Sequence, residues 1–155
     1  MPCETKTLFE REFESTREAA HAALCDALSA MDRGGWLSAH EDRFALWLCL
    51  EEALNNAIRH GNGDNPEARI WLEVREADGV GRISVGDEGP GFDPAALEMP
   101  CPDQLRGRGI CLIRHYMEQV CYDRRSGRLE MQYRLKRAGT EDRLKGGEDG
   151  LVSYL

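Results

Sequence analysis

The hydrophobic period of this sequence changes at one dense helix breaker, Gly-Asn-Gly-Asp-Asn-Pro at residues 61–66. Before the breaker, apolar residues recur every three or four positions over 19–31 and again over 44–57, which predicts two amphipathic helices. After it, apolar and polar residues alternate over 70–75, as in a strand with one buried face. The fold must therefore combine helices with a sheet.

Local signals predict how these elements begin. Residues 5–13 alternate loosely and predict a strand. The sequences Ser-Thr-Arg-Glu from Ser15 and Ser-Ala-His-Glu from Ser38 are capping boxes, which favour helix starts at these two points.

The remaining strands are expected to form hairpins. A turn at 77–79 joins two strands, a helix is expected over 107–119 after the proline-containing loop 92–106, and a final hairpin turns at 126–127. Because short turns join the paired strands, the sheet should be mainly antiparallel, with the helices on one face. The predicted fold class is an α/β (α+β) two-layer sandwich, not a doubly wound sheet.

Composition narrows the class of protein. The 155 residues are enough for one domain, and a formal charge of -8 argues against direct nucleic-acid binding. No apolar stretch is long enough to span a membrane and the N-terminus does not resemble a secretion signal, so we expect a cytoplasmic protein. The six cysteines include no Cys-x-x-Cys pair, and we expect them to be reduced.

A polar column is predicted near the end of the second helix. Glu52, Asn56 and His60 are four residues apart and share one helix face, where a carboxylate and a carboxamide suit a hydrated Mg²⁺ with a base beside it. The alternative is a solvated helix face, and the same spacing also describes a column that begins at Glu51 and continues through Asn55 to Arg59.

Two glycine-containing segments follow. Asp87, Gly89 and Gly91 lie in a tight turn after a strand, where the backbone can approach a flat ligand and the carboxylate can accept from an exocyclic amino group. The sequence Gly107-Arg108-Gly109 opens a helix, whose free amides and dipole attract phosphate. Taken singly, each segment is also compatible with an ordinary turn or helix cap.

In this order, the three segments resemble the N, G1 and G2 boxes of the GHKL ATP-binding superfamily, which includes gyrase, histidine kinases and MutL. Residues 52–61 and 87–94 are most similar to those of the anti-sigma factor serine/threonine kinases. The resemblance implies the Bergerat/GHKL fold, a GHKL ATPase domain over residues 1–137 and an ATP lid at 92–106. The polar, glycine-rich composition of residues 138–155 predicts a flexible C-terminal tail.

The resemblance also implies roles for individual residues. Glu52 corresponds to the general base and Asn56 to the Mg²⁺ ligand, whereas the role of His60 stays open. Asp87 would hold the adenine amino group. The remaining matched positions would line the adenine pocket or contact the phosphates of ATP; they are Gly89 and Gly91 for the pocket, and Gly107, Arg108 and Gly109 for the phosphates.

The function implied by this resemblance is an ATP-dependent protein-serine kinase that is also an anti-sigma factor. Such a protein regulates transcription by partner switching: it binds a sigma factor, phosphorylates a STAS-domain anti-anti-sigma antagonist, and is typically a homodimer. Two alternatives stay open, a nucleotide-responsive binding switch without phosphotransfer and a detached histidine-kinase catalytic domain.

Overall fold

The computed structural model describes residues 4–91 and 109–136. The predicted lid at 92–106, Gly107, Arg108 and the tail at 138–155 lie outside these ranges, so the predictions made for them stay predictions.

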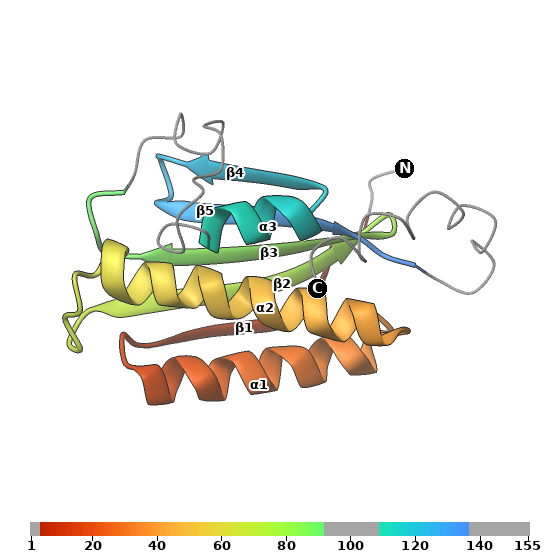
Figure 1. Cartoon of the computed structure of the whole chain (residues 1–155), viewed down its shortest axis with the longest axis horizontal. Coiled ribbons are helices and arrows are strands. Elements are labelled where there is room, and N and C mark those ends of the chain that lie inside the picture. Colours follow the sequence, from red (N-terminus) through yellow and green to blue (C-terminus); the bar gives the residue numbers. More distant parts are fainter. Residues whose placement is uncertain (1–3, 92–108, 137–155) are drawn as a thin grey trace.

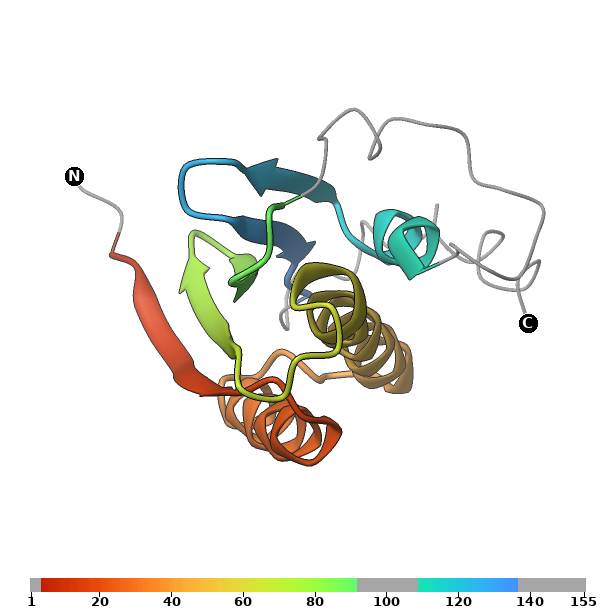
Figure 2. The ribbon, with the colours of Figure 1, turned by 90° about the vertical axis from the view of Figure 1, so that its left-hand side faces the viewer.

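One sheet and three helices form two layers (Figures 1 and 2). The sheet has the order β1-β2-β3-β5-β4, and each neighbouring pair is antiparallel. The helices lie on one face of the sheet, with α2 between α1 and α3. This arrangement confirms the predicted two-layer sandwich. In chain order, the elements are β1 (Lys6–Glu14), α1 (Arg17–Arg33), α2 (His40–Asn56), the π-helix η1 (Ala57–Gly61), β2 (Arg69–Ala77), β3 (Val80–Asp87), α3 (Gly109–Tyr116), β4 (Gln119–Asp123) and β5 (Arg128–Arg134).

The core lies between the helices and the inner face of the sheet. The alternating residues Ile70, Leu72 and Val74 of β2 are all buried, as their period predicts. They pack in one cluster with apolar side chains of the helices, including Leu46 and Leu50 of α2. Burial of this face fixes α2 on the sheet. The polar side chains on the other sides of the helix are therefore free to contact neighbouring elements or ligands.

Three local predictions need correction. Thr16, not Ser15, caps α1, because its hydroxyl accepts from the Ala19 amide at 3.2 Å. The N-cap of α2 is Ala39, one residue later than the predicted Ser38, and its amide donates to the buried Asp42 carboxylate at 3.2 Å. The predicted helix over 107–119 already ends at Tyr116, because the chain then joins the sheet as β4 and Gln119 pairs with Gln132 of β5.

Two predictions from composition can be compared with the described residues. In these ranges, no helix is both long and apolar enough to cross a lipid bilayer. Cys25, Cys49 and Cys121 are free thiols, but Cys111 is disulfide-bonded, so the expectation that all the cysteines are reduced is wrong at this position.

Candidate active site

Two side chains that lie one turn apart on α2 face the first residue of α3. A methyl group added at Gly109 would lie 2.6 Å from Glu52 Oε2 and 3.6 Å from Asn56 Nδ2. Both side chains are partly buried, and α2 packs against α3. The structure therefore brings Glu52, Asn56 and Gly109 together from two segments that are far apart in the sequence.

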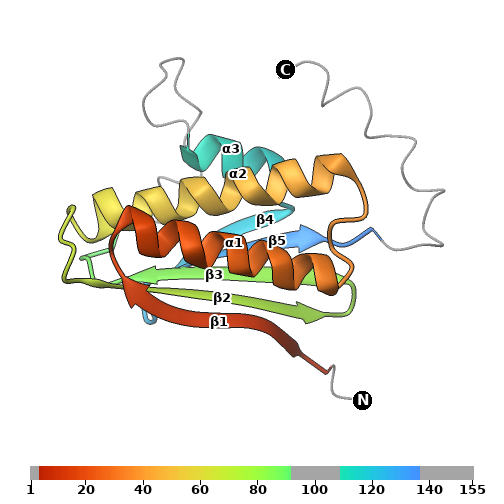
Figure 3. The same ribbon diagram turned by 90° about the horizontal axis from the view of Figure 1, so that it is seen from below.

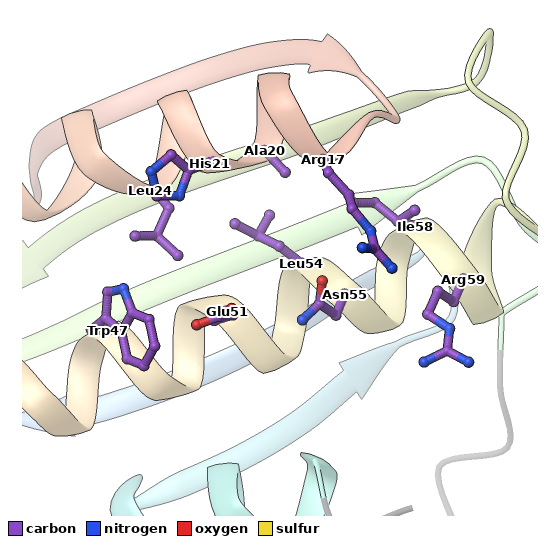
Figure 4. A pocket seen from close by; sticks show the side chains of 10 residues that line it. All are labelled: Arg17, Ala20, His21, Leu24, Trp47, Glu51, Leu54, Asn55, Ile58 and Arg59. Atoms are coloured by element: carbon purple, nitrogen blue, oxygen red, sulfur yellow. The ribbon is translucent and has the colours of Figure 1, made fainter.

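The alternative column on α2 faces elsewhere. Glu51, Asn55 and Arg59 line a cavity between α1 and α2, together with residues of α1 (Figure 4). Of the two columns that the spacing allowed, the one that contains Glu52 lies beside α3. The fold thus resolves an ambiguity that the four-residue spacing left open.

The turn after β3 is packed against the end of the helical segment. The Gly89 amide donates to Asp87 Oδ1 at 2.8 Å, which fixes the carboxylate relative to the turn. A methyl group at Gly61 would overlap the Asp87 carboxylate, and one at Gly89 would overlap the Gly61 carbonyl. Glycine is required at both positions by close approach, and Gly61 is a site residue that sequence reasoning had placed in the helix breaker and at the end of the 52–61 motif without giving it a role.

Asn62 holds this contact together and was also missed. Its Oδ1 accepts from the Glu88 amide at 2.8 Å, and its Nδ2 donates to the Arg69 carbonyl at 3.0 Å. The side chain is only 9% exposed, although a residue between two glycines is normally interpreted as part of an exposed turn. Asn62 thereby links the end of η1 to the start of β2 and the end of β3.

We expect Asn62→Asp to lower the free energy of unfolding by about 1–3 kcal/mol, because aspartate lacks the amide donor and leaves the Arg69 carbonyl without its partner. Urea unfolding measures this difference. The matched control is Asn65→Asp, since exposed Asn65 uses only its Oδ1, as acceptor from the Glu67 amide at 3.0 Å. Equal effects of the two changes would show that the bond from Asn62 Nδ2 is not stabilising.

Tyr122 of β4 is another residue that sequence reasoning missed. Gly91 has a φ of +80°, and a methyl group there would overlap the Tyr122 hydroxyl. Burial, and next the charge of Asp87, raise the pKa of Tyr122. The tyrosine therefore borders the same turn, but it could not be assigned from the sequence, because its partner Gly91 lies far away in the chain.

The helical segment that carries the site ends in an unusual turn. Residues 57–61 form the π-helix η1, closed by a bond from the Asn62 amide to the Ala57 carbonyl at 2.8 Å. Such wide turns occur frequently at functional sites. The side chain of His60 is exposed, and the described contacts assign it no role in the site.

Both carboxylates of the site are harder to ionise than free side chains. Burial and, to a smaller extent, the neighbouring Glu51 charge raise the pKa of Glu52. Burial also raises the pKa of Asp87, although the Gly89 amide partly opposes this shift. A carboxylate with a raised pKa is the stronger base, so the environment of Glu52 suits proton abstraction.

A raised pKa also has a cost in stability at neutral pH. Because Glu52 binds its proton more tightly in the folded state, its ionisation costs stability, and this cost develops as the pH rises from the unfolded-state pKa through the higher folded-state pKa. We expect Glu52→Gln to raise the melting temperature at pH 7, and the gain to shrink as the pH falls toward 4.5 or below. Exposed Glu67→Gln is the control for thermal melts across this range and should show no such trend; a gain that is independent of pH would contradict the assignment.

The side chains present fit Mg-ATP better than a metal held by protein alone. Among residues 4–91 and 109–136, no three His, Cys, Asp or Glu side chains group closely enough to hold a metal ion. Mg²⁺ bound to a nucleotide needs only one or two protein oxygens, and the carboxamide of Asn56, whose Nδ2 lies toward Gly109, also carries one oxygen. Asp87 Oδ2 accepts no hydrogen bond from the described residues, so an amino group of a base could donate to it.

Comparison with known proteins agrees with this geometry. The profile of the histidine kinase-like ATPase domain matches residues 13–134, which include every described site residue. The serine/threonine-protein kinase BtrW of Bordetella bronchiseptica is 36% identical over 91 residues, which cover 55% of this chain and 64% of the relative. The alignment thus spans slightly less than two thirds of the relative's length.

Proposed function

The chain belongs to the family of histidine kinase-like ATPase domains, and on this premise we propose that it is an ATP-dependent protein serine/threonine kinase. The observation that carries the proposal is the contact of Glu52 and Asn56 with Gly109 at the start of α3. It places a carboxylate of raised pKa and a carboxamide at the free amides of a helix N-terminus, where phosphates bind well. The similarity to the serine/threonine-protein kinase BtrW supports the same reaction class.

Each site residue has a distinct task in this proposal. Asp87 accepts a hydrogen bond from the adenine amino group, while Gly61 and Gly89 let two backbones approach closely enough to form the base pocket. Asn56 would hold Mg²⁺, which offsets negative charge on the phosphates. Gly109, and by resemblance Gly107 and Arg108, would contact the phosphate chain.

The reaction is transfer of the γ-phosphoryl group to a serine hydroxyl. The serine oxygen forms a bond to the γ-phosphorus, the bond from that phosphorus to the β–γ bridging oxygen breaks, and ADP leaves. Glu52 accepts the serine proton as this happens. Positioning and charge compensation supply the remaining catalysis.

We further propose the partners that the resemblance implies. The substrate would be a STAS-domain anti-anti-sigma protein, and the unphosphorylated antagonist would compete with a sigma factor for the same kinase homodimer. The net charge of -8 is consistent with protein partners and not with direct binding to DNA. Transcription would then be regulated by partner switching.

A transfer assay with purified proteins tests the proposal. With Mg²⁺, ATP and the STAS-domain protein, we expect phosphoserine on that protein, together with calorimetric binding of ATP and ADP. Binding of both nucleotides without transfer would favour a nucleotide-responsive switch, and phosphohistidine would favour a histidine kinase. Absence of heat with either nucleotide would overturn the assignment of the whole site.

A further inference from the structure

The cavity lined by Glu51, Asn55 and Arg59 lies on the other side of α2 from Glu52. It has a volume of about 330 Å³ and lies between α1 and α2, which run side by side (Figures 3 and 4). Its floor is apolar and includes the buried residues Leu24, Leu54 and Ile58. Trp47, which is 39% exposed, borders one end. A groove with an apolar floor and an exposed aromatic wall is suited to receive a peptide segment.

The other end of this groove carries positive charge. Arg17, at the start of α1, and Arg59, in η1, both line it and are exposed (Figure 4). In the part of the chain that the structure describes, neither guanidinium forms an ion pair or side-chain hydrogen bond. Glu51 also lines the groove, but the two arginines outweigh its single charge and favour an acidic occupant in a protein with a net charge of -8.

The chain leaves the described fold close to this groove. The Lys136 carbonyl accepts from Ser38 Oγ at 3.3 Å, and Lys136 Nζ lies 3.8 Å from Asp42 Oδ1. Ser38 and Asp42 flank the start of α2. Trp47 follows further along α2, and Arg59 comes after the end of α2, in η1. The chain that follows Lys136 thus begins at the Trp47 end of the groove.

The length of that following chain is sufficient to reach the arginines. From Asp42 to Arg59, a helix rises by about 26 Å at 1.5 Å per residue. An extended segment from residue 137 to 148 spans up to about 40 Å. Residue 148 can therefore lie beside Arg59 without strain on the connection.

The chemistry of the segment matches the groove. Residues 146–155 contain the adjacent acids Glu148 and Asp149, four apolar or aromatic side chains after them, and no basic residue. Residues 137–145 are different, because their acids Glu141 and Asp142 are mixed with three basic side chains. We propose that residues 146–155 of this chain bind in the α1–α2 groove, with Glu148 and Asp149 at Arg17 and Arg59.

This docking is independent of the proposed kinase activity. The groove and the Glu52 column are on different faces of α2, so a segment bound in the groove would not enter the nucleotide site. The same docked segment could occur in a kinase, in a binding switch or in a catalytically inert protein. Failure of the docking test would leave the nucleotide assignment intact, and the reverse also holds.

Hydrogen exchange measured by mass spectrometry on the full chain tests the proposal. Amides of 146–155 should exchange about tenfold or more slowly than in the same segment as a free peptide. Reversal of the groove charges in Arg17→Glu with Arg59→Glu should abolish this protection, as should Glu148→Lys with Asp149→Lys. Combining all four changes should restore it, because the charges are then exchanged between the partners.

Matched controls separate this specific contact from general charge effects. The change Glu141→Lys with Asp142→Lys alters the same charges in the neighbouring residues 137–145 and should leave the protection of 146–155 unchanged. Arg82→Glu, on β3 and outside the groove, should also have no effect. Circular dichroism of each variant should match that of the unaltered chain, so that loss of protection cannot be caused by unfolding.

The remaining outcomes overturn the proposal. Free exchange of 146–155 in the unaltered chain would mean that the groove has another occupant, such as a separate acidic partner. Protection that rises with protein concentration would mean that the segment binds a second copy. Protection that survives the reversal of Arg17 and Arg59, or that the four-fold charge exchange does not restore, would place the segment elsewhere.

Discussion

Glu52→Gln should lower phosphoserine formation by about 100-fold or more while ATP binding is retained. The substitution keeps the shape of the side chain but removes the only group in the described site that is placed to accept the serine proton. A general base contributes about 10²–10⁴-fold to such a reaction. Single-turnover transfer from labelled ATP measures the loss, and calorimetry measures the binding.

The matched control for this change is the preceding residue. Glu51→Gln removes the same charge from the same turn of α2, but Glu51 lines the α1–α2 groove instead of facing Gly109. We expect transfer by this variant to stay within a few-fold of the unaltered protein. Comparable losses in both variants would indicate a general electrostatic effect, and undiminished transfer by Glu52→Gln would exclude Glu52 as the base.

Asp87→Asn should weaken ATP binding by about 10- to 150-fold, the equivalent of about 1.5–3 kcal/mol for a lost hydrogen bond to a charged group. Asparagine can still accept from the Gly89 amide through Oδ1, so the turn is preserved. Its other terminal atom is then an amide donor that would face the adenine amino group, which is also a donor. Calorimetric titration with ATP measures the change.

Inosine triphosphate provides the control for this second substitution, because its base lacks the exocyclic amino group. The unaltered protein should prefer ATP, and Asp87→Asn should lose most of that preference. An equal loss of affinity for both nucleotides would mean that Asp87 acts by shaping the turn and not by recognising adenine. Comparing the affinities for ATP and inosine triphosphate therefore shows whether Asp87 recognises adenine or only stabilises the turn, and no further variant is needed.

Much of the fold could be predicted from local patterns. The breaker at 61–66 separates helices from strands as expected, and the alternation in β2 and β5 correctly identifies their buried faces. The errors lie at the ends of elements. The predicted helix over 107–119 was too long because its apolar residues continue into β4, and a continuous apolar pattern does not show where a helix gives way to a strand.

The candidate site was predictable in part. The motifs identified Glu52, Asn56, Asp87, Gly89, Gly91 and Gly109, and the structure places Glu52 and Asn56 beside Gly109, Asp87 and Gly89 beside Gly61, and Gly91 beside Tyr122. Asn62 and Tyr122 were missed because their roles depend on partners more than twenty residues away in the chain. No local pattern distinguishes a buried asparagine of this kind from one in an exposed turn.

Periodicity, capping residues and glycine positions therefore identified the types of elements and the chemistry that they carry, because these depend on neighbours within a few residues. The fold alone determined which face of α2 meets α3, why Gly61 and Gly89 must lack side chains, and which arginines border a groove. These properties arise from contacts between segments that are distant in the chain. Such contacts depend on how whole buried surfaces pack together, and packing of that kind has no short-range signature.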